Sequence, residues 1–300
     1  MVPYIGSGPY CYANSLAMVL GPGAPAPAVI EVLTGSPFGF CLLGDRLPLF
    51  DPYGWDPDLG LDDAIGRLGW TCSRRGADGP AAALELLRTA LEAGPALAGP
   101  MEMGLFRHQP GMTAPIEADH FVAVLAADDE RVRFHDPHGH PFATLPTGAF
   151  LAAWRGETIA YRSTEYTIRF GFSRDREVSP EGALREARPA FAAWLRGRAD
   201  LAPPPGTVGG AEAVHRLADR VGAGLPDDVL GFLTWFAVRV GARRLADAAA
   251  WHTDEAAEIL ENQAMLVGEL QYALVNDDRA GAERTLRALA PTYERLAGAL

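Results

Sequence analysis

The chain is organised around one stretch, Pro9-Tyr10-Cys11-Tyr12-Ala13-Asn14-Ser15-Leu16-Ala17-Met18-Val19-Leu20, in which a cysteine opens an apolar run. Leu16, Val19 and Leu20 recur at helical spacing after a lead rich in glycine and proline, which predicts a helix that begins near Cys11. The first turn of a helix carries unpaired N–H groups and the positive end of the helix dipole, which favour the reactive thiolate. A single cysteine is more often a buried structural residue, so this stretch alone leaves both interpretations open.

Composition indicates a globular protein. The chain has 300 residues, 48% of them hydrophobic and 21% charged, enough for two domains or one large domain. No apolar run approaches the roughly 20 residues that span a bilayer, and no charged segment followed by an apolar core marks a signal peptide. We therefore expect a cytoplasmic protein without a membrane partner.

Three features of the composition argue against particular classes of function. All 26 basic residues are arginine, so a Walker A phosphate loop and a pyridoxal Schiff base, which both need lysine, are excluded within this chain. The net charge of −12 argues against nucleic-acid partners. The odd, widely spaced cysteines form neither a disulfide framework nor a C-x-x-C metal site, and Cys41 and Cys72 are expected in the core.

The periodicity of the sequence changes along the chain. Helical patterns over residues 58–70 and 80–93 end at glycines. Strands are expected where β-branched and aromatic residues concentrate: 96–98, 120–126, 131–135, 158–161 and 166–172. From about residue 179 the pattern is helical to the end. The sequence thus predicts an α+β fold, with N-terminal helices and an antiparallel sheet over residues 1–175 and an all-α helical domain over 176–300.

A possible catalytic triad follows from the predicted hairpin. A cysteine nucleophile needs a base and a third group that orients the base. His120 opens one strand and Asp136 ends the other, and a polar turn at residues 128–130 would bring these ends side by side. The carboxylate of Asp136 could then bind one imidazole nitrogen while the other faces Cys11. Asp119 is a competing carboxylate, but neighbours on a strand point to opposite faces.

These segments resemble a known group of enzymes. The similar segments are 10–15, 34–40, 94–95, 100–104, 119–125, 136–137 and 153–155, in family order across about 1–165. They resemble papain-like cysteine peptidases that process double-glycine leader peptides. More closely, they resemble the acyltransferase family typified by the N-terminal domain of the butirosin biosynthesis acyltransferase. The later residues resemble the helical domain that often follows. The resemblance implies a papain-like fold with Cys11 as nucleophile, His120 as general base and Asp136 as its orienter.

The resemblance also implies a reaction and its partners. We expect acyl transfer through a Cys11 acyl-enzyme, from an acyl carrier protein or a small acyl thioester to an amine acceptor in natural-product biosynthesis. No cofactor is expected in the chain itself, although phosphopantetheine would be present on a carrier protein. Two alternatives stay open: a cysteine peptidase, thioester hydrolase or cyclase with the same triad, and a non-catalytic papain-like binding module.

The lead before the cysteine departs from the papain-like pattern. Those peptidases usually carry a glutamine there that helps bind the oxyanion, and residues 2–10 contain none. The backbone N–H of Cys11 and a further donor, Tyr4, Ser7 or Asn14, are the candidates for this role. Losing one oxyanion donor costs about 10²–10³ in rate. That loss disfavours cleavage of a stable amide more than transfer from an activated thioester.

Other residues suggest weaker hypotheses. Phe38, in a turn that presents aromatic residues, together with Glu102 and His108, is expected to line the substrate site, with structural roles as the alternative. Arginines paired at 74–75 and 243–244 could contact a phosphopantetheine arm or an acidic carrier protein, but we expect them on solvated faces. The spacing of His135, His138 and His140 resembles a metal site, but the intervening Gly139 indicates an exposed turn. We therefore expect no metal.

Overall fold

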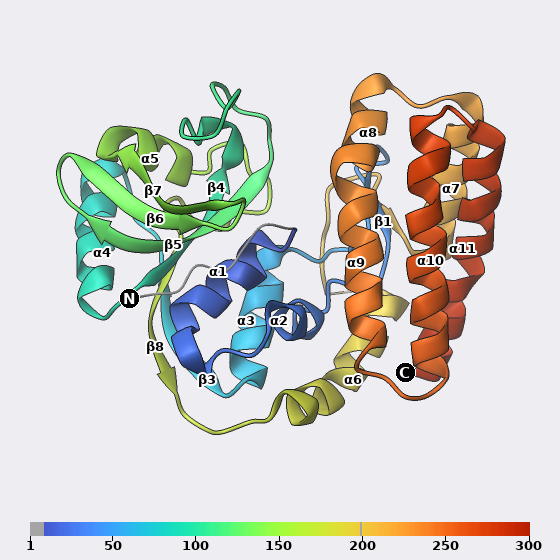
Figure 1. Ribbon diagram of the computed structural model, residues 1–300, viewed down its shortest axis with the longest axis horizontal. Helices are drawn as coiled ribbons and strands as arrows, with labels where there is room; N and C mark the ends of the chain where they lie inside the picture. The colour runs from blue at the N-terminus through green and yellow to red at the C-terminus, as the bar shows by residue number, and fades with distance from the viewer. Residues whose placement is uncertain (1–8, 199) are drawn as a thin grey trace. The chain divides into compact units, whose positions relative to one another are not determined.

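The computed structural model describes residues 9–198 and 200–300, and its elements form two compact units (Figure 1). Unit 1 comprises Met1–Pro27 and Ile65–Val178, and unit 2 comprises Ala28–Ala64 and Ser179–Leu300. The expected boundary near residue 175 lies close to the observed one at 178. The expectation that residues 1–175 form one continuous domain is wrong, because residues 28–64 belong with the C-terminal helices.

An antiparallel sheet of six strands forms the centre of unit 1, in the order β3-β8-β4-β5-β6-β7. The strands are β3 (Trp70–Arg75), β4 (Ala96–Glu102), β5 (Asp119–Ala127), β6 (Arg131–Asp136), β7 (His140–Pro146) and β8 (Ile168–Arg174). Strands β5 and β6 form the expected hairpin, with Ala123 opposite His135 and Val124 opposite Phe134. The α+β prediction with an antiparallel sheet is confirmed.

Three α-helices of unit 1 pack on this sheet: α1 (Cys11–Leu20), α4 (Pro80–Glu92) and α5 (Thr147–Trp154). Leu87 of α4 and Phe150 of α5 share a fully buried core with Val122 and Phe134 of the sheet. Helix α1 packs along β5 (Figure 1). Short 3-10 helices follow α1 at Gly21–Gly23 and β4 at Met103–Leu105. The core thus fixes the strands that carry His120 and Asp136.

Helices make up most of unit 2. They are α2 (Pro27–Leu33), α6 (Pro180–Arg196), α7 (Gly210–Ala223), α8 (Asp227–Phe232), a π-helical turn (Leu233–Ala237), α9 (Val238–Ala249), α10 (Glu255–Val275) and α11 (Arg279–Ala299). A small antiparallel sheet in the order β2-β1-β9 joins β2 (Leu47–Leu49), β1 (Cys41–Leu43) and β9 (Val208–Gly209). Helix α3 (Pro57–Arg67) contains the boundary between the units. Among the described residues, no single helix combines the length and apolar composition needed to cross a bilayer.

A buried arginine explains why residues 28–64 belong to unit 2. Arg244 on α9 is 5% exposed. Its Nε donates to Glu31 Oε1 at 2.6 Å, and one terminal nitrogen bonds Asp51 and the carbonyl of Phe50. Arg243 beside it pairs with Asp247 at the surface. The expectation that both arginines face solvent is therefore wrong for Arg244.

Two secondary-structure predictions also need correction. The helix expected to reach residue 70 ends at Arg67, and Trp70 begins β3 instead. Gly69 reverses the chain there with φ +76°, and a Cβ at this position would lie 2.3 Å from the carbonyl oxygen of Arg176. Residues 158–161, expected as a strand, form turns after Gly156, to whose carbonyl oxygen Ile159 donates.

Candidate active site

Helix α1 begins at Cys11, so the thiol occupies the first helical position, as the sequence predicts. Tyr10 precedes it in the left-handed conformation, with φ 81° and ψ 49°, which is uncommon for a residue other than glycine. The Asn14 backbone N–H bonds the Tyr10 carbonyl at 2.9 Å, and the Asn14 side chain donates to the Pro9 carbonyl at 3.1 Å. These bonds fix the backbone that presents the half-buried Cys11.

One hydrogen bond ties α1 to the strand that carries His120. Ser15, one helical turn after Cys11, donates from Oγ to the carbonyl oxygen of Phe121 at 3.0 Å, and this bond is buried. The ring of Tyr12 also packs edge-on against that of Phe121, with 6.1 Å between the centroids. These contacts hold α1, which carries the thiol, against β5, which carries the imidazole.

His120 links the thiol to the carboxylate. Its Nε2 lies 2.8 Å from Asp136 Oδ1, and its side chain also hydrogen-bonds Cys11. Because Nε2 is engaged with Asp136, Nδ1 is the ring nitrogen left to interact with the thiol. Burial alone would lower the pKa of His120. The hydrogen bonds to Asp136 and Cys11, with the negative charge of both groups, outweigh burial and raise that pKa to about 10.

Asp136 is fully buried and accepts four hydrogen bonds. Oδ1 accepts from the His138 backbone N–H at 2.8 Å in addition to bonding His120. Oδ2 lies 2.8 Å from His108 Nε2 and accepts from Gln109 Nε2 at 2.7 Å. Burial would raise the pKa of Asp136, but these donors and the His120 charge hold it well below its usual range.

Glu102 fixes the loop that brings His108 and Gln109 to Asp136. Its carboxylate accepts from the backbone N–H groups of Gly104, Ile116 and Glu117 at 2.9 to 3.1 Å, and from the Thr158 hydroxyl. The side chain is buried and its oxygens bind the chain itself. The expectation that Glu102 lines the substrate site is therefore wrong; it shapes the loop instead.

The other expected substrate residues divide between two places. Phe38 is fully buried in unit 2 and stacks on Phe191, with 4.0 Å between ring centroids, so it offers no surface to a ligand and its prediction is wrong. His108 is half-buried and lies beside the triad, where it bonds Asp136 and lines a hollow formed by residues 107–113. Gln109 was not expected from the sequence, because it lies in a loop without periodicity.

The structure also places one of the oxyanion side-chain candidates, Asp119 and the two other cysteines. Of the oxyanion candidates, Tyr4 and Ser7 lie outside the described residues, and the Asn14 amide is engaged with Pro9. Asp119 accepts from the Tyr161 hydroxyl at 2.7 Å, which keeps it from competing with Asp136. Cys41 is buried, and burial raises the pKa of its thiol, whereas Cys72 is half-buried on β3 rather than in the core.

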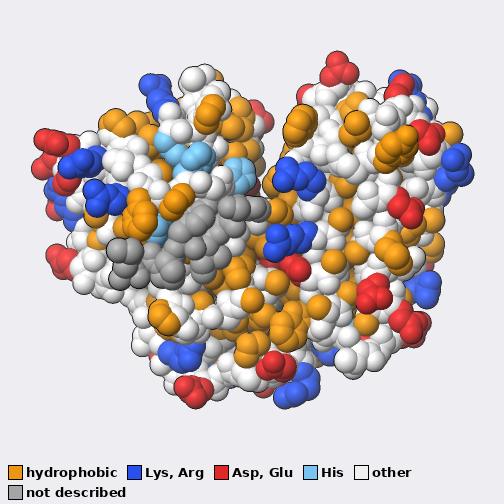
Figure 2. All heavy atoms as spheres, viewed as in Figure 1, with side chains coloured by type: hydrophobic (Ala, Val, Ile, Leu, Met, Phe, Trp, Pro, Cys, Tyr) orange, Lys and Arg blue, Asp and Glu red, His pale blue; other side chains and the backbone are white. Residues whose placement is uncertain are grey.

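The three histidines that suggested a metal site do not form one cluster. His135 is buried, and its Nδ1 accepts from the backbone N–H of Phe142 at 3.0 Å. His138 lies by His120, with 5.1 Å between ring centroids, and His140 lies by His108, with 5.2 Å. Histidine side chains reach the surface on one face of the molecule (Figure 2).

Comparison with known proteins finds similarity across both units. Residues 203–300 match the family described as YobF C-terminal domain. The "Uncharacterized protein YobF" of Bacillus subtilis (strain 168) is 29% identical over 304 residues, which cover 97% of this chain and 95% of that protein. The similar region therefore includes the segments that carry Cys11, His120 and Asp136.

Proposed function

We propose that the protein is a cysteine-dependent acyltransferase, in which Cys11 takes an acyl group from a thioester and passes it to an amine. The supporting observation is that His120 interacts with both Cys11 and Asp136: its Nε2 lies 2.8 Å from Asp136 Oδ1, and Cys11 contributes to its raised pKa. A cysteine at a helix start, a base and an orienting carboxylate are the parts that nucleophilic catalysis requires. The same arrangement, a helix carrying the thiol against an antiparallel sheet carrying the base, supports a papain-like fold for unit 1.

The charges at the site suit a thiolate and an imidazolium. With its pKa raised to about 10, His120 holds a proton at neutral pH, beside the Cys11 sulfur. A neighbouring imidazolium favours the thiolate, the reactive form of cysteine. His120 then serves first as an acid, which refines its expected role as a base.

Two steps complete the proposed reaction. The Cys11 thiolate attacks the carbonyl carbon of the acyl thioester, the bond from that carbon to the donor sulfur breaks, and His120 protonates the departing thiol. The acyl group is then joined to Cys11 as a thioester. An amine attacks this carbonyl carbon, its proton passes to the neutral His120, and the new amide leaves as the Cys11 thiolate re-forms.

The donor in this proposal is a small acyl thioester or the phosphopantetheine arm of an acyl carrier protein, and the pathway is natural-product synthesis, as the sequence resemblance suggests. A thioester carbonyl is more reactive than an amide carbonyl, which suits a site whose second oxyanion donor is not assigned. The backbone N–H of Cys11, at the start of α1, is the first donor for the developing negative charge.

Intact-mass spectrometry tests the acyl-enzyme. The protein is incubated with acyl N-acetylcysteamine thioesters of several chain lengths, with and without a primary amine. Wild type and Cys72→Ala, which removes the half-buried cysteine of β3, are expected to gain the acyl mass, whereas Cys11→Ala gains none. An adduct on Cys11→Ala, or none on any variant, would contradict the proposal.

The fate of the adduct separates the alternatives. Discharge that requires the amine and yields an amide supports a transferase. Rapid discharge to water indicates a thioester hydrolase, and cleavage of peptide substrates indicates a peptidase. Cyclisation is recognised by loss of the adduct as a cyclic amide when the acyl chain carries its own amine.

A further inference from the structure

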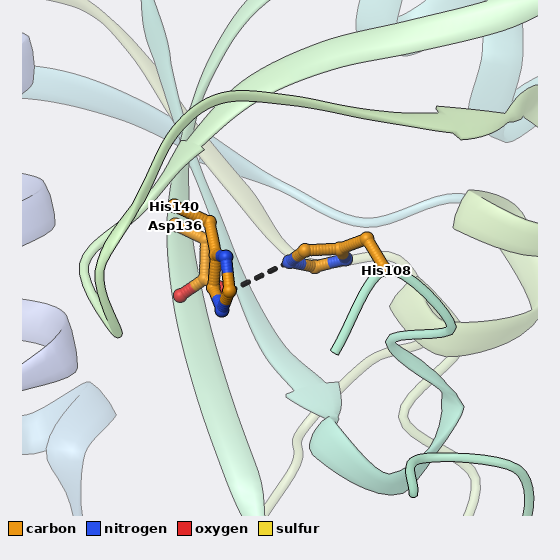
Figure 3. Close-up of side chains that lie close together, drawn as sticks. All are labelled: His108, Asp136 and His140. Carbon is orange, nitrogen blue, oxygen red and sulfur yellow. Dashed lines mark hydrogen bonds and ion pairs between the residues drawn. The ribbon is translucent and has the colours of Figure 1, made fainter. Parts of the chain in front are cut away.

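A cluster of three potential metal ligands includes Asp136 and two histidines that are not part of the proposed triad. His108, Asp136 and His140 each offer one ligand atom, and these atoms all lie within 4.8 Å of one another. It is the one such group found among residues 9–198 and 200–300. Figure 3 shows Asp136 and His140 on one side and His108 reaching toward them from a separate loop.

The backbone fixes two of the three ligands. Asp136 ends β6 and His140 begins β7, and the two residues are paired across this antiparallel hairpin. The third, His108, is held next to Asp136 by the loop that Glu102 anchors, and its ring lies 5.2 Å from that of His140, at 89° to it. The backbone of the hairpin and of the Glu102 loop therefore holds the three side chains close together.

Two imidazoles and one carboxylate form a ligand set typical of zinc. Such sites hold the ion at about 2.0–2.2 Å from each donor and leave a fourth, open position. Tetrahedral geometry at that distance separates ligand atoms by about 3.3 Å. His108 Nε2 and Asp136 Oδ2 are 2.8 Å apart, and no two ligand atoms of the cluster are more than 4.8 Å apart. Closing the set requires side-chain movement of about 1.5 Å or less.

The surroundings permit that movement. His108 and His140 are half-buried, and His108 also lines the hollow of residues 107–113. His108 Nδ1 is buried and has no hydrogen-bond partner among the described residues, so the bond from Nε2 to Asp136 Oδ2 is the one that a movement of this ring changes. Hard cations such as Mg²⁺ and Ca²⁺ prefer sets made only of oxygen, which leaves a transition-metal ion as the fitting class.

We infer that His108, Asp136 and His140 form a site for a divalent transition-metal ion of the zinc class, built on the carboxylate that also holds His120. Binding through His108 Nε2 replaces the hydrogen bond between this atom and Asp136 Oδ2, and the ring then carries its proton on Nδ1. Asp136 then bridges the metal through Oδ2 and His120 through Oδ1. Occupancy of this site draws carboxylate charge away from His120 and lowers the reactivity of Cys11.

Zinc titration tests the site itself. The measurement uses Cys11→Ser protein, because a cysteine thiolate would bind zinc independently, and follows Zn²⁺ by competition with a chromophoric chelator. We expect one ion per chain, with affinity reduced about tenfold or more by His140→Gln or His108→Gln. The matched control is His215→Gln, an exposed histidine on α7 in unit 2, which should bind as tightly as the parent. Equal affinity in the His140→Gln and His215→Gln proteins would overturn the inference.

Alkylation of Cys11 tests the coupling. In wild type, Zn²⁺ should slow the reaction of Cys11 with iodoacetamide, and a chelator should restore it. His140→Gln protein should show little slowing at the same Zn²⁺ concentration. Equal slowing in both would mean that the ion binds the Cys11 thiolate directly, and would contradict the coupling. Neither measurement uses the acyl-transfer reaction. A negative result in either one would therefore contradict the metal site or its coupling to Cys11 without contradicting the proposed function.

Discussion

The hydroxyl of Ser15 donates to the carbonyl oxygen of Phe121 across 3.0 Å, and this buried bond joins the helix of Cys11 to the strand of His120. It spans 106 residues of sequence. The relative position of thiol and imidazole therefore depends on a residue that takes no part in the proposed chemistry.

Removing this hydroxyl should weaken both stability and reactivity. Ser15→Ala leaves the buried Phe121 carbonyl without that donor, which costs about 1–3 kcal/mol. We expect a lower free energy of unfolding in urea and slower alkylation of Cys11 in the folded protein. Ser73→Ala, which changes an exposed serine in the same unit, is the control and should behave as wild type. Wild-type values for Ser15→Ala would show that the bond does not position α1.

Stability should depend on pH through His120. Its pKa is about 10 when folded and about 6.5 when unfolded, so the folded state binds the proton more tightly. The stabilisation is complete below about pH 6.5 and is lost as pH rises toward 10. The free energy of unfolding should therefore fall across this range in wild type, by an amount on the order of a few kcal/mol.

His120→Gln should remove most of this fall, because glutamine does not titrate. The difference between the two unfolding free energies, measured in urea at pH 6, 8 and 9.5, isolates the contribution of His120. A difference that does not change with pH would show that His120 carries no bound proton in the folded protein at neutral pH.

The stability of the protein should depend more on the charge of the side chain at position 109 than on its shape. Gln109→Glu places a second carboxylate against Asp136 Oδ2, where Gln109 Nε2 now donates at 2.7 Å. Two buried carboxylates in contact cannot both stay ionised without cost, so we expect lower stability at pH 8 than at pH 5 relative to wild type. Gln109→Met, which removes the hydrogen bond without adding charge, should show much less pH dependence. Identical pH profiles for the two variants would argue against the contact.

Arg244 and Arg243 form a matched pair in unit 2. Arg244→Met removes the guanidinium that pairs with the buried Glu31 and Asp51, which costs about 3–5 kcal/mol. Arg243→Met removes an exposed pair with Asp247 and should cost less than about 1 kcal/mol. Thermal unfolding of the two variants distinguishes them, and equal shifts would contradict the burial of Arg244.

The sequence predicts the local elements of the site well. The apolar spacing after Cys11 places the start of α1, and the alternation around the polar turn at residues 128–130 places the hairpin that brings His120 to Asp136. Both signals are periodic and short in range, which is why they can be read from one sequence. The roles assigned to these residues stay predictions.

The long-range arrangement could not be read in this way. Arg244 looks like a solvated charge beside Arg243, and only folding shows its ion pair with Glu31, 213 residues away. Gln109 lies in a loop whose path depends on the buried Glu102 and its bonds to residues 104, 116 and 117. Phe38 looked like a ligand contact because an aromatic residue in a turn gives no sign of whether the core will cover it.

The interrupted course of unit 1 affects how the protein is made. Cys11 emerges from the ribosome early, but the strands bearing its partners follow only after the chain has supplied residues 28–64 to the other unit. The nascent thiol therefore stays without its imidazole until more than 100 further residues have been translated. A fragment that ends at residue 175 would contain the whole triad. Its residues 28–64 would, however, lack the C-terminal helices that bury them.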